Sequence, residues 1–116
     1  MSETLGDRIK RVRKERGLGL RETASKVGIS ATFLSRVETN GQPSPPGEEV
    51  IRKLATLLSD DFDALMQLAG RVPKDVADVI KSDPAMPEFL RTARAQNLTG
   101  EHLLTMIGKA DKPERS

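Results

Sequence analysis

Apolar residues along the chain recur every three or four positions, which is the spacing of one face of an α-helix. Leu5, Ile9 and Val12 show this spacing first, and they predict a helix over residues 4–16 that stops at Gly17. No stretch alternates between apolar and polar residues as a half-buried strand would, so the pattern predicts an all-α fold. The same spacing predicts further helices at about 20–27, 31–38, 47–58 and 59–70, and three shorter ones within 73–82, 84–96 and 99–110.

The residues between the apolar stretches carry signals that start and stop helices. Thr4 with Asp7 forms a capping pair for the first helix, and Ser30 is placed to cap the third. Gly28 stands at a sharp turn between two helices, where a positive φ is expected. The loop NGQPSPPG over residues 40–47 excludes regular structure, because its prolines lack an N–H donor and fix φ.

A domain boundary is expected between Gly70 and Pro73. Residues 1–70 would then form one domain, and residues 71–116 a C-terminal helical module whose tail, DKPERS, frays. At the start of the chain, MSETLGDRI lacks the apolar segment of a signal peptide. No apolar run approaches the roughly 18 residues of a membrane span, so a cytoplasmic protein is expected.

The third predicted helix has an unusual outer surface. Leu34 and Val37 are three residues apart and share its inner face, whereas most other positions carry small or polar side chains. An ordinary solvated helix face would carry Glu and Lys instead. Ala24 is small where the third helix would cross the second. The residues on the outer side are Ala31, Thr32, Ser35, Arg36 and Thr39.

The segment RETASKVGISATFLSRVE resembles the helix-turn-helix of the Cro and phage-repressor family, the XRE-type regulators. LGDRIKRVRKERG resembles the first helix of that family and IRKLATLL its fourth, so the resemblance covers about residues 4–70. It implies a five-helix Cro/repressor-like domain followed by a short C-terminal helical module. It also implies that residues 30–39 form a recognition helix lying in the major groove of double-stranded DNA.

The resemblance assigns roles to individual positions of the recognition helix. Its matched positions place Ala31, Thr32 and Arg36 against base edges, where an arginine can bind guanine O6 and N7 and a methyl can contact thymine. Phe33 would either contact DNA or pack inside the domain. The positions matched to phosphate or sugar contacts are Ser30, Ser35, Thr39 and Asn40.

Two features depart from the family pattern. The family commonly starts the second helix with Ser or Thr followed by Gln, whereas this chain has Gly19 and Leu20, so Arg21 is expected to take over the phosphate contact. The proline-rich loop after the recognition helix is also longer than is common.

Basic residues crowd the start of the chain. Residues 1–58 hold eleven Lys/Arg and seven Asp/Glu, whereas residues 59–116 hold eight and ten, within a net charge of +2. This asymmetry indicates that the basic N-terminal half binds a polyanion and that the acidic C-terminal half is a separate module. The alternative is that the basic residues only form a solvated helix face. The resemblance implies that Arg13 pairs with Glu38, with phosphate binding as the alternative. Four other basic residues of the first helix are expected to be solvated: Arg8, Lys10, Arg11 and Lys14.

The residues needed for catalysis or metal binding are not assembled in this sequence. The chain has no cysteine, which excludes disulfides and thiolate ligands, and His102 is its single histidine. Asp60, Asp61 and Asp63 form an acidic cluster, but they open a helix, where the dipole favours them. We therefore expect no enzyme activity, no cofactor and no metal site.

The C-terminal module carries apolar residues that its short helices cannot bury alone. A partner subunit is the economical place for them, and a homodimer would supply two half-sites about one turn of DNA apart. The residues expected at this dimer interface are Val79, Phe89, Leu90, Leu103, Leu104 and Ile107.

Together these features predict a sequence-specific regulator of transcription, a repressor that binds a palindromic operator as a homodimer. Two other functions fit the same sequence: an antitoxin whose C-terminal helices wrap a toxin and which regulates its own operon, or an interaction adaptor that keeps the fold without reading bases. The layout is also compatible with that of regulators inactivated by a peptidase that cuts the C-terminal module.

Overall fold

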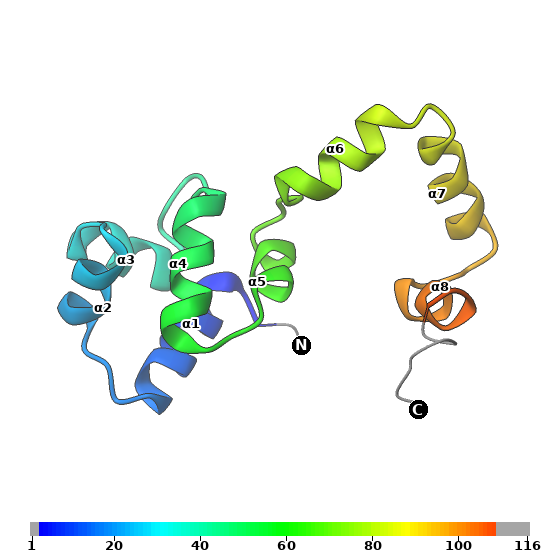
Figure 1. Cartoon of the computed structure of the whole chain (residues 1–116). Helices are drawn as coiled ribbons and strands as arrows, with labels where there is room; N and C mark the ends of the chain where they lie inside the picture. Colours follow the sequence, from blue (N-terminus) through cyan, green and yellow to red (C-terminus); the bar gives the residue numbers. More distant parts are fainter. Residues whose placement is uncertain (1–2, 109–116) are drawn as a thin grey trace. The chain divides into compact units, whose positions relative to one another are not determined.

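The computed structural model describes residues 3–108, which form eight α-helices and no strand (Figure 1). The described chain divides into two compact units, the first ending at Pro73 and the second beginning at Lys74. The all-α prediction is therefore confirmed. No helix in this part of the chain is both long enough and apolar enough to cross a membrane.

The first unit contains the five helices that the apolar spacing predicts. Each begins and ends within about three residues of its predicted bounds, because the caps and glycines mark the ends. Thr39 to Gly47 connects the third helix to the fourth. The helices are α1 (Leu5–Glu15), α2 (Leu20–Val27), α3 (Ala31–Glu38), α4 (Glu48–Leu58) and α5 (Phe62–Leu68).

One hydrophobic core holds these five helices together. The helix α3 packs against α1 and α2, while α4 packs against α2 and α5. Burying one Leu or Ile side chain contributes about 1.5–3 kcal/mol, so the buried apolar side chains supply most of the favourable free energy of folding this unit. Val50 and Leu57 are half-buried at the rim of this core. The largest fully buried apolar side chains are Ile9, Leu34, Ile51, Leu54, Leu58, Leu65 and Met66.

The predicted helix caps are present. The Thr4 hydroxyl accepts from the Asp7 N–H at 3.0 Å, and the Asp7 carboxylate accepts from the Thr4 N–H at 3.4 Å, which completes a capping box. The Ser30 hydroxyl accepts from the Phe33 N–H at 3.0 Å and starts α3. Gly28 has φ of 76°, the left-handed conformation that its place in the turn predicted.

Gly6 lets α1 approach α3 closely. A Cβ atom at this position would clash with the Val37 carbonyl oxygen and would lie 3.0 Å from that of Glu38 and 2.9 Å from Asn40 Oδ1. The first two are backbone atoms, which cannot move aside without shifting the helix. The end of α3 therefore lies directly against the start of α1.

Replacing Gly6 with alanine should destabilise the first unit, although alanine is the better helix former. Alanine adds about 1 kcal/mol of helix propensity, but overpacking against a backbone carbonyl costs about 1–3 kcal/mol. We expect a net loss of stability in urea denaturation. Gly41→Ala is the matched control, since the nearest atom to its Cβ would be Thr39 Oγ1 at 3.7 Å. A gain in stability for Gly6→Ala would show that the two helices separate easily.

Arg71 lies within the boundary expected between Gly70 and Pro73, and it belongs to the first unit. Its Nε donates to the Pro46 carbonyl oxygen at 2.7 Å, and its Nη2 donates to that of Pro45 at 2.9 Å. These bonds fix Arg71, which follows α5, Ala69 and Gly70, to the proline-rich loop. The first unit accordingly ends at Pro73.

The second unit consists of three short helices with almost no core of its own. They are α6 (Lys74–Ser82), α7 (Met86–Ala95) and α8 (Gly100–Met106), and α6 contacts α7. Ala93 is the single buried apolar residue among the described residues of this unit. Pro87 lies in the first turn of α7, where its missing N–H is tolerated. The tail DKPERS, expected to fray, lies outside the described residues.

Candidate nucleic-acid interface

The turn between α2 and α3 is built from small residues. Ala24 and Thr23 are fully buried in α2, and Gly28 then reverses the chain, so that α3 starts at Ala31. Gly19, which stands in place of the usual capping Ser or Thr, has no side chain to offer. Instead, the Glu22 carboxylate accepts from the Gly19 N–H at 3.5 Å. The start of α2 is therefore held without the capping residue that the family pattern predicts.

The two sides of α3 have opposite characters. Leu34 and Val37 are buried in the core, together with the carboxylate-bearing Glu38, whereas Thr32 and Arg36 are exposed. No side chain on the exposed side other than Arg36 is long and charged. The exposed surface of α3 is thus small, polar and uncharged except at one point.

The other residues predicted to contact DNA lie around this surface, some with structural duties as well. Phe33 is half-buried against the core, which favours the packing interpretation of its role. The Thr39 hydroxyl donates to the Ser35 carbonyl oxygen at 3.0 Å, and Asn40 ends the helix with φ of 61°. The Ser30 hydroxyl caps α3, as described above. Arg21 is exposed in the first turn of α2.

Arg13 and Glu38 form a buried ion pair between α1 and α3. Arg13 Nε donates to Glu38 Oε2 at 2.7 Å and Nη2 donates to Oε1 at 2.8 Å, with side-chain exposures of 9% and 5%. Arg13 Nη1 also donates to the Leu18 carbonyl oxygen at 2.9 Å. The hydrogen bond to Glu38 raises the pKa of Arg13. With all three nitrogens engaged and buried, Arg13 has the geometry of a structural pair rather than of a phosphate contact.

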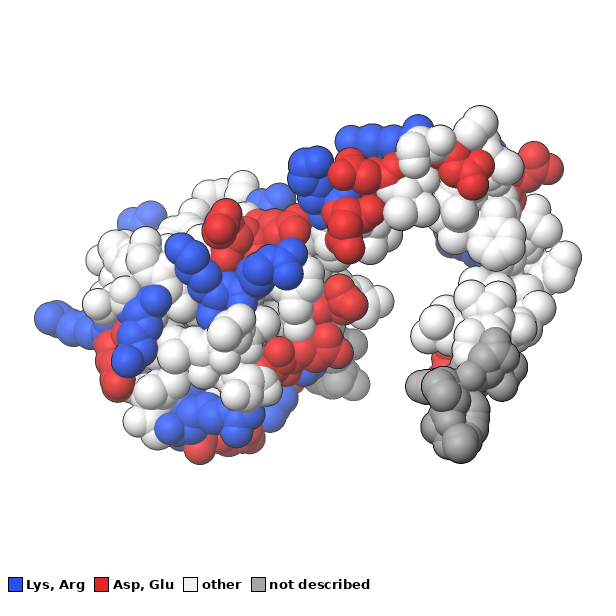
Figure 2. Space-filling view, viewed as in Figure 1, with Lys and Arg blue, Asp and Glu red and all other residues white. Residues whose placement is uncertain are grey.

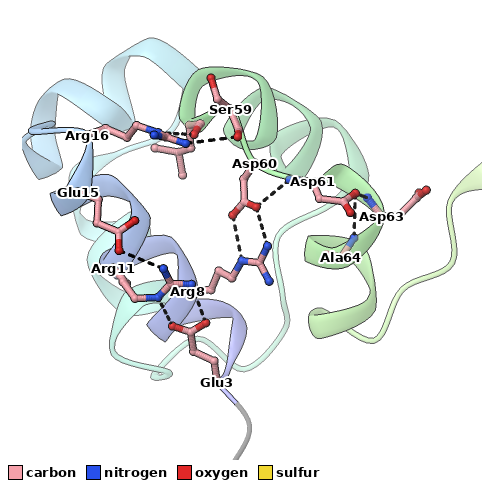
Figure 3. A network of polar contacts seen from close by, with 11 residues as sticks. Glu3, Arg8, Arg11, Glu15, Arg16, Ser59, Asp60, Asp61, Asp63 and Ala64 are labelled. Carbon is pink, nitrogen blue, oxygen red and sulfur yellow. Dashed lines mark hydrogen bonds and ion pairs between the residues drawn. The ribbon is translucent and has the colours of Figure 1, made fainter.

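Other arginines of α1 also have partners inside the unit (Figure 3). Arg8 Nε and Nη2 donate to the two carboxylate oxygens of Asp60 at 3.0 and 2.6 Å, and this bond lowers the pKa of Asp60. Arg11 donates to Glu3 at 2.6 and 3.0 Å and to Glu15 at 3.1 Å. The expectation that Arg8 is solvated was therefore wrong, because Asp60, 52 residues away, comes to lie beside it. Arg11 remains half-exposed.

Backbone carbonyl groups at the end of α4 bind a further arginine. Arg16 Nε donates to the Leu58 carbonyl oxygen at 2.7 Å, and its Nη2 reaches that of Ser59 at 3.4 Å (Figure 3). Asp61 caps α5 by accepting from the N–H groups of Asp63 and Ala64. The acidic residues thus have two structural roles. Asp61 lies at the start of the helix, as predicted, and caps it, whereas Asp60 binds Arg8 of α1.

Ion pairing changes which cations of the first unit are available to a ligand. Figure 2 shows basic and acidic side chains side by side over much of the visible face of this unit. Arg52 pairs with Glu48 and also stacks on the Phe62 ring at 4.1 Å. Among the described residues of the first unit, the basic side chains without any hydrogen bond or ion pair are Lys10, Lys14, Arg21, Lys26, Arg36 and Lys53.

A buried crossing of α2 on α3, with a small and polar outer surface on α3, defines the helix-turn-helix class. The family profile described as "Helix-turn-helix domain" matches residues 4–68. The chain therefore belongs to the helix-turn-helix family and is a transcriptional regulator of the XRE type.

Within this class, the chain is similar to two named regulators. The chain is 36% identical over 102 residues to the HTH-type transcriptional repressor RghR of Bacillus subtilis (strain 168), a match that covers 88% of this chain and 74% of RghR. It is 36% identical over 95 residues to the HTH-type transcriptional regulator SinR of the same organism, covering 73% of this chain and 85% of SinR. A crystal structure of SinR, the master regulator for biofilm formation, in complex with DNA superposes with a TM-score of 0.50 at 35% identity, covering 54% of this chain and 98% of that chain.

Proposed function

We propose that this regulator represses transcription by binding a palindromic operator in double-stranded DNA as a homodimer, with α3 in the major groove. The observation that carries the proposal is the exposed side of α3, where small residues allow close approach and Arg36 is the one long donor. RghR, a relative over most of both chains, is a repressor, and SinR has been crystallised with DNA. The protein would act in the cytoplasm, in direct contact with the DNA.

Within this proposal each side chain has a chemical role. The Arg36 guanidinium would donate two hydrogen bonds to guanine O6 and N7, while Ala31 and the Thr32 methyl would contact a thymine methyl. Arg21, at the start of α2, would bind a phosphate through its unpaired guanidinium. The remaining polar groups around α3 would contact phosphate or sugar: Ser30, Ser35, Thr39 and Asn40.

The homodimer is supported by the apolar surface of the second unit. Phe89 is 49% exposed and Leu104 is 60% exposed, although both are large apolar side chains. Leu103 is half-buried. Such a surface is costly in water, and a second copy of the same helices would cover it. The other apolar residues exposed there include Val76, Val79, Leu90 and Ile107.

Selection from a random pool of duplexes with the purified chain tests the proposal. We expect one preferred site with two inverted half-sites about one helical turn apart. Enrichment of no sequence would contradict operator binding and would favour the interaction-adaptor alternative. A preferred site without symmetry would contradict the dimer alone.

Replacing Arg36 with alanine should relax specificity at one base pair of each half-site. We expect a loss of about 1–3 kcal/mol per half-site on the selected operator and little change on a scrambled duplex. Arg21→Ala is the matched control, since loss of a phosphate contact should weaken binding to both duplexes alike. Competition binding with the two duplexes measures both effects. An equal loss on both duplexes for Arg36→Ala would show that Arg36 binds phosphate.

A further inference from the structure

The cations of α1 fall into two groups that differ in their freedom to bind a ligand. The arginines near and within α1 are held by Asp60, by Glu3 and Glu15, by Glu38, or by carbonyl groups of α4, as described above. Lys10 and Lys14 are exposed and make no hydrogen bond or ion pair with any residue that the structure describes. The two lysines are four residues apart, so they lie on one face of the helix.

The position of this face is fixed by its neighbours on α1. Gly6 lies one turn before Lys10 and contacts the end of α3, while Arg13 lies three residues after Lys10 and pairs with Glu38. Lys10 therefore stands between the two points at which α1 contacts α3, on the flank beside the C-terminal end of that helix. Lys14 continues the same face by one turn. Asp7 is nearby, but its carboxylate is engaged in the capping box with Thr4.

We propose that Lys10 and Lys14 bind phosphates of the DNA backbone on the side of the major groove next to the end of α3. This inference rests on the proposed function. It extends the interface from the helix-turn-helix to α1. It also assigns a role to two lysines that have no carboxylate partner among the described residues, unlike Arg8, Arg11 and Arg13.

The dimensions of the groove support this assignment. A helix with its side chains is about 10–12 Å across and fills a major groove about 12 Å wide. The protein elements that flank a helix in the groove must therefore contact the DNA phosphates along one or the other edge of the groove. The helix α2 flanks α3 on one part of its length, and α1 flanks it at Val37 and Glu38. Lysine suits a backbone contact, since it is a flexible point charge that needs no fixed geometry.

Salt dependence of operator binding tests the inference in the intact chain. Each phosphate contact contributes about 0.9 to the slope of log K against log salt concentration. The variant K10Q/K14Q should therefore lower the slope by about 3–4 on an operator with two half-sites, and by about 2 on a single half-site. The loss should be the same on selected and scrambled duplexes, because phosphate contacts carry no sequence information.

A matched control separates local contact from net charge. The variant K53Q/K81Q removes one lysine on α4 and one on α6 that are also exposed and have no partner within residues 3–108. Its slope should stay at the wild-type value. Equal slopes for K10Q/K14Q and wild type would overturn the inference and leave the proposed function intact, as would equal losses for the two double variants. Failure of the wild-type chain to bind any duplex would overturn both. Thermal melting of each variant shows that it is folded.

Discussion

Replacing Phe89 with aspartate should leave the DNA-binding unit folded and reduce operator affinity by about 10²–10⁴-fold. In the proposed dimer, binding of the first domain holds the second close to its half-site, and this effective concentration supplies the avidity. Phe89 is half-exposed on α7, and a carboxylate there would be desolvated by the partner helices at high cost. Sedimentation should show a monomer, and a titration with labelled operator should show the loss of affinity.

Two further variants make this test decisive. Ala95→Asp adds the same charge at an exposed position on a different side of α7 from Phe89 and Leu90, and it should leave the dimer intact. A chain ending at Pro73 should remain folded, because it keeps Arg71 and the whole hydrophobic core of the first unit. It should bind single half-sites with the affinity of the Phe89→Asp variant. A truncated chain that remains a dimer with full operator affinity would place the interface in α1 to α5 instead.

Replacing Arg13 with alanine should cost about 3–5 kcal/mol of stability, the typical cost of leaving one partner of a buried ion pair unpaired. The Glu38 carboxylate, which is 5% exposed in the intact chain, would lose its two donors, and the Leu18 carbonyl oxygen would also lose its bond. Urea denaturation measures the change. In contrast, Arg11→Ala removes a half-exposed arginine and should change stability little.

Replacing both partners of the pair separates the cost of an unpaired buried charge from the loss of the ion pair itself. The variant R13M/E38M leaves no buried charge, and we expect it to be more stable than Arg13→Ala, because well-packed apolar pairs can match a buried ion pair. The roles would be reversed if Arg13→Ala melted at the same temperature as Arg11→Ala and lost DNA binding. In that case, Arg13 would be a phosphate contact.

Local signals in the sequence were sufficient for the helices of the first unit. Capping by Thr4 and Ser30 and the positive φ of Gly28 follow from residues within three or four positions of each other. The same holds for the buried side of α3, since Leu34 and Val37 are neighbours on one face. The family resemblance then supplied the pairing of Arg13 with Glu38, which spans 25 residues and has no local signal.

Contacts between distant residues could not be predicted from such local patterns. The bond from Arg8 to Asp60 spans 52 residues, and the bonds from Arg16 to the end of α4 use carbonyl groups that every residue carries. Likewise, nothing near Arg71 in the sequence indicates that its partners are the carbonyls of Pro45 and Pro46. The prediction of the candidate site suffered most from these unpredicted contacts, because fewer basic residues of α1 are free to bind a phosphate than the sequence suggests.

Because Arg71 is bonded to the proline-rich loop, the linker between the two units is very short. Arg71 is fixed to the proline-rich loop and α6 begins at Lys74, so Val72 and Pro73 alone connect them. The three Cα steps from Arg71 to Lys74 span at most about 11 Å. Moving one half-site by half a helical turn shifts its major groove about 17 Å along the duplex and to the opposite side. In the proposed dimer, the choice of target genes would therefore depend on half-site spacing as well as on base sequence, and a few residues inserted after Val72 would widen that choice.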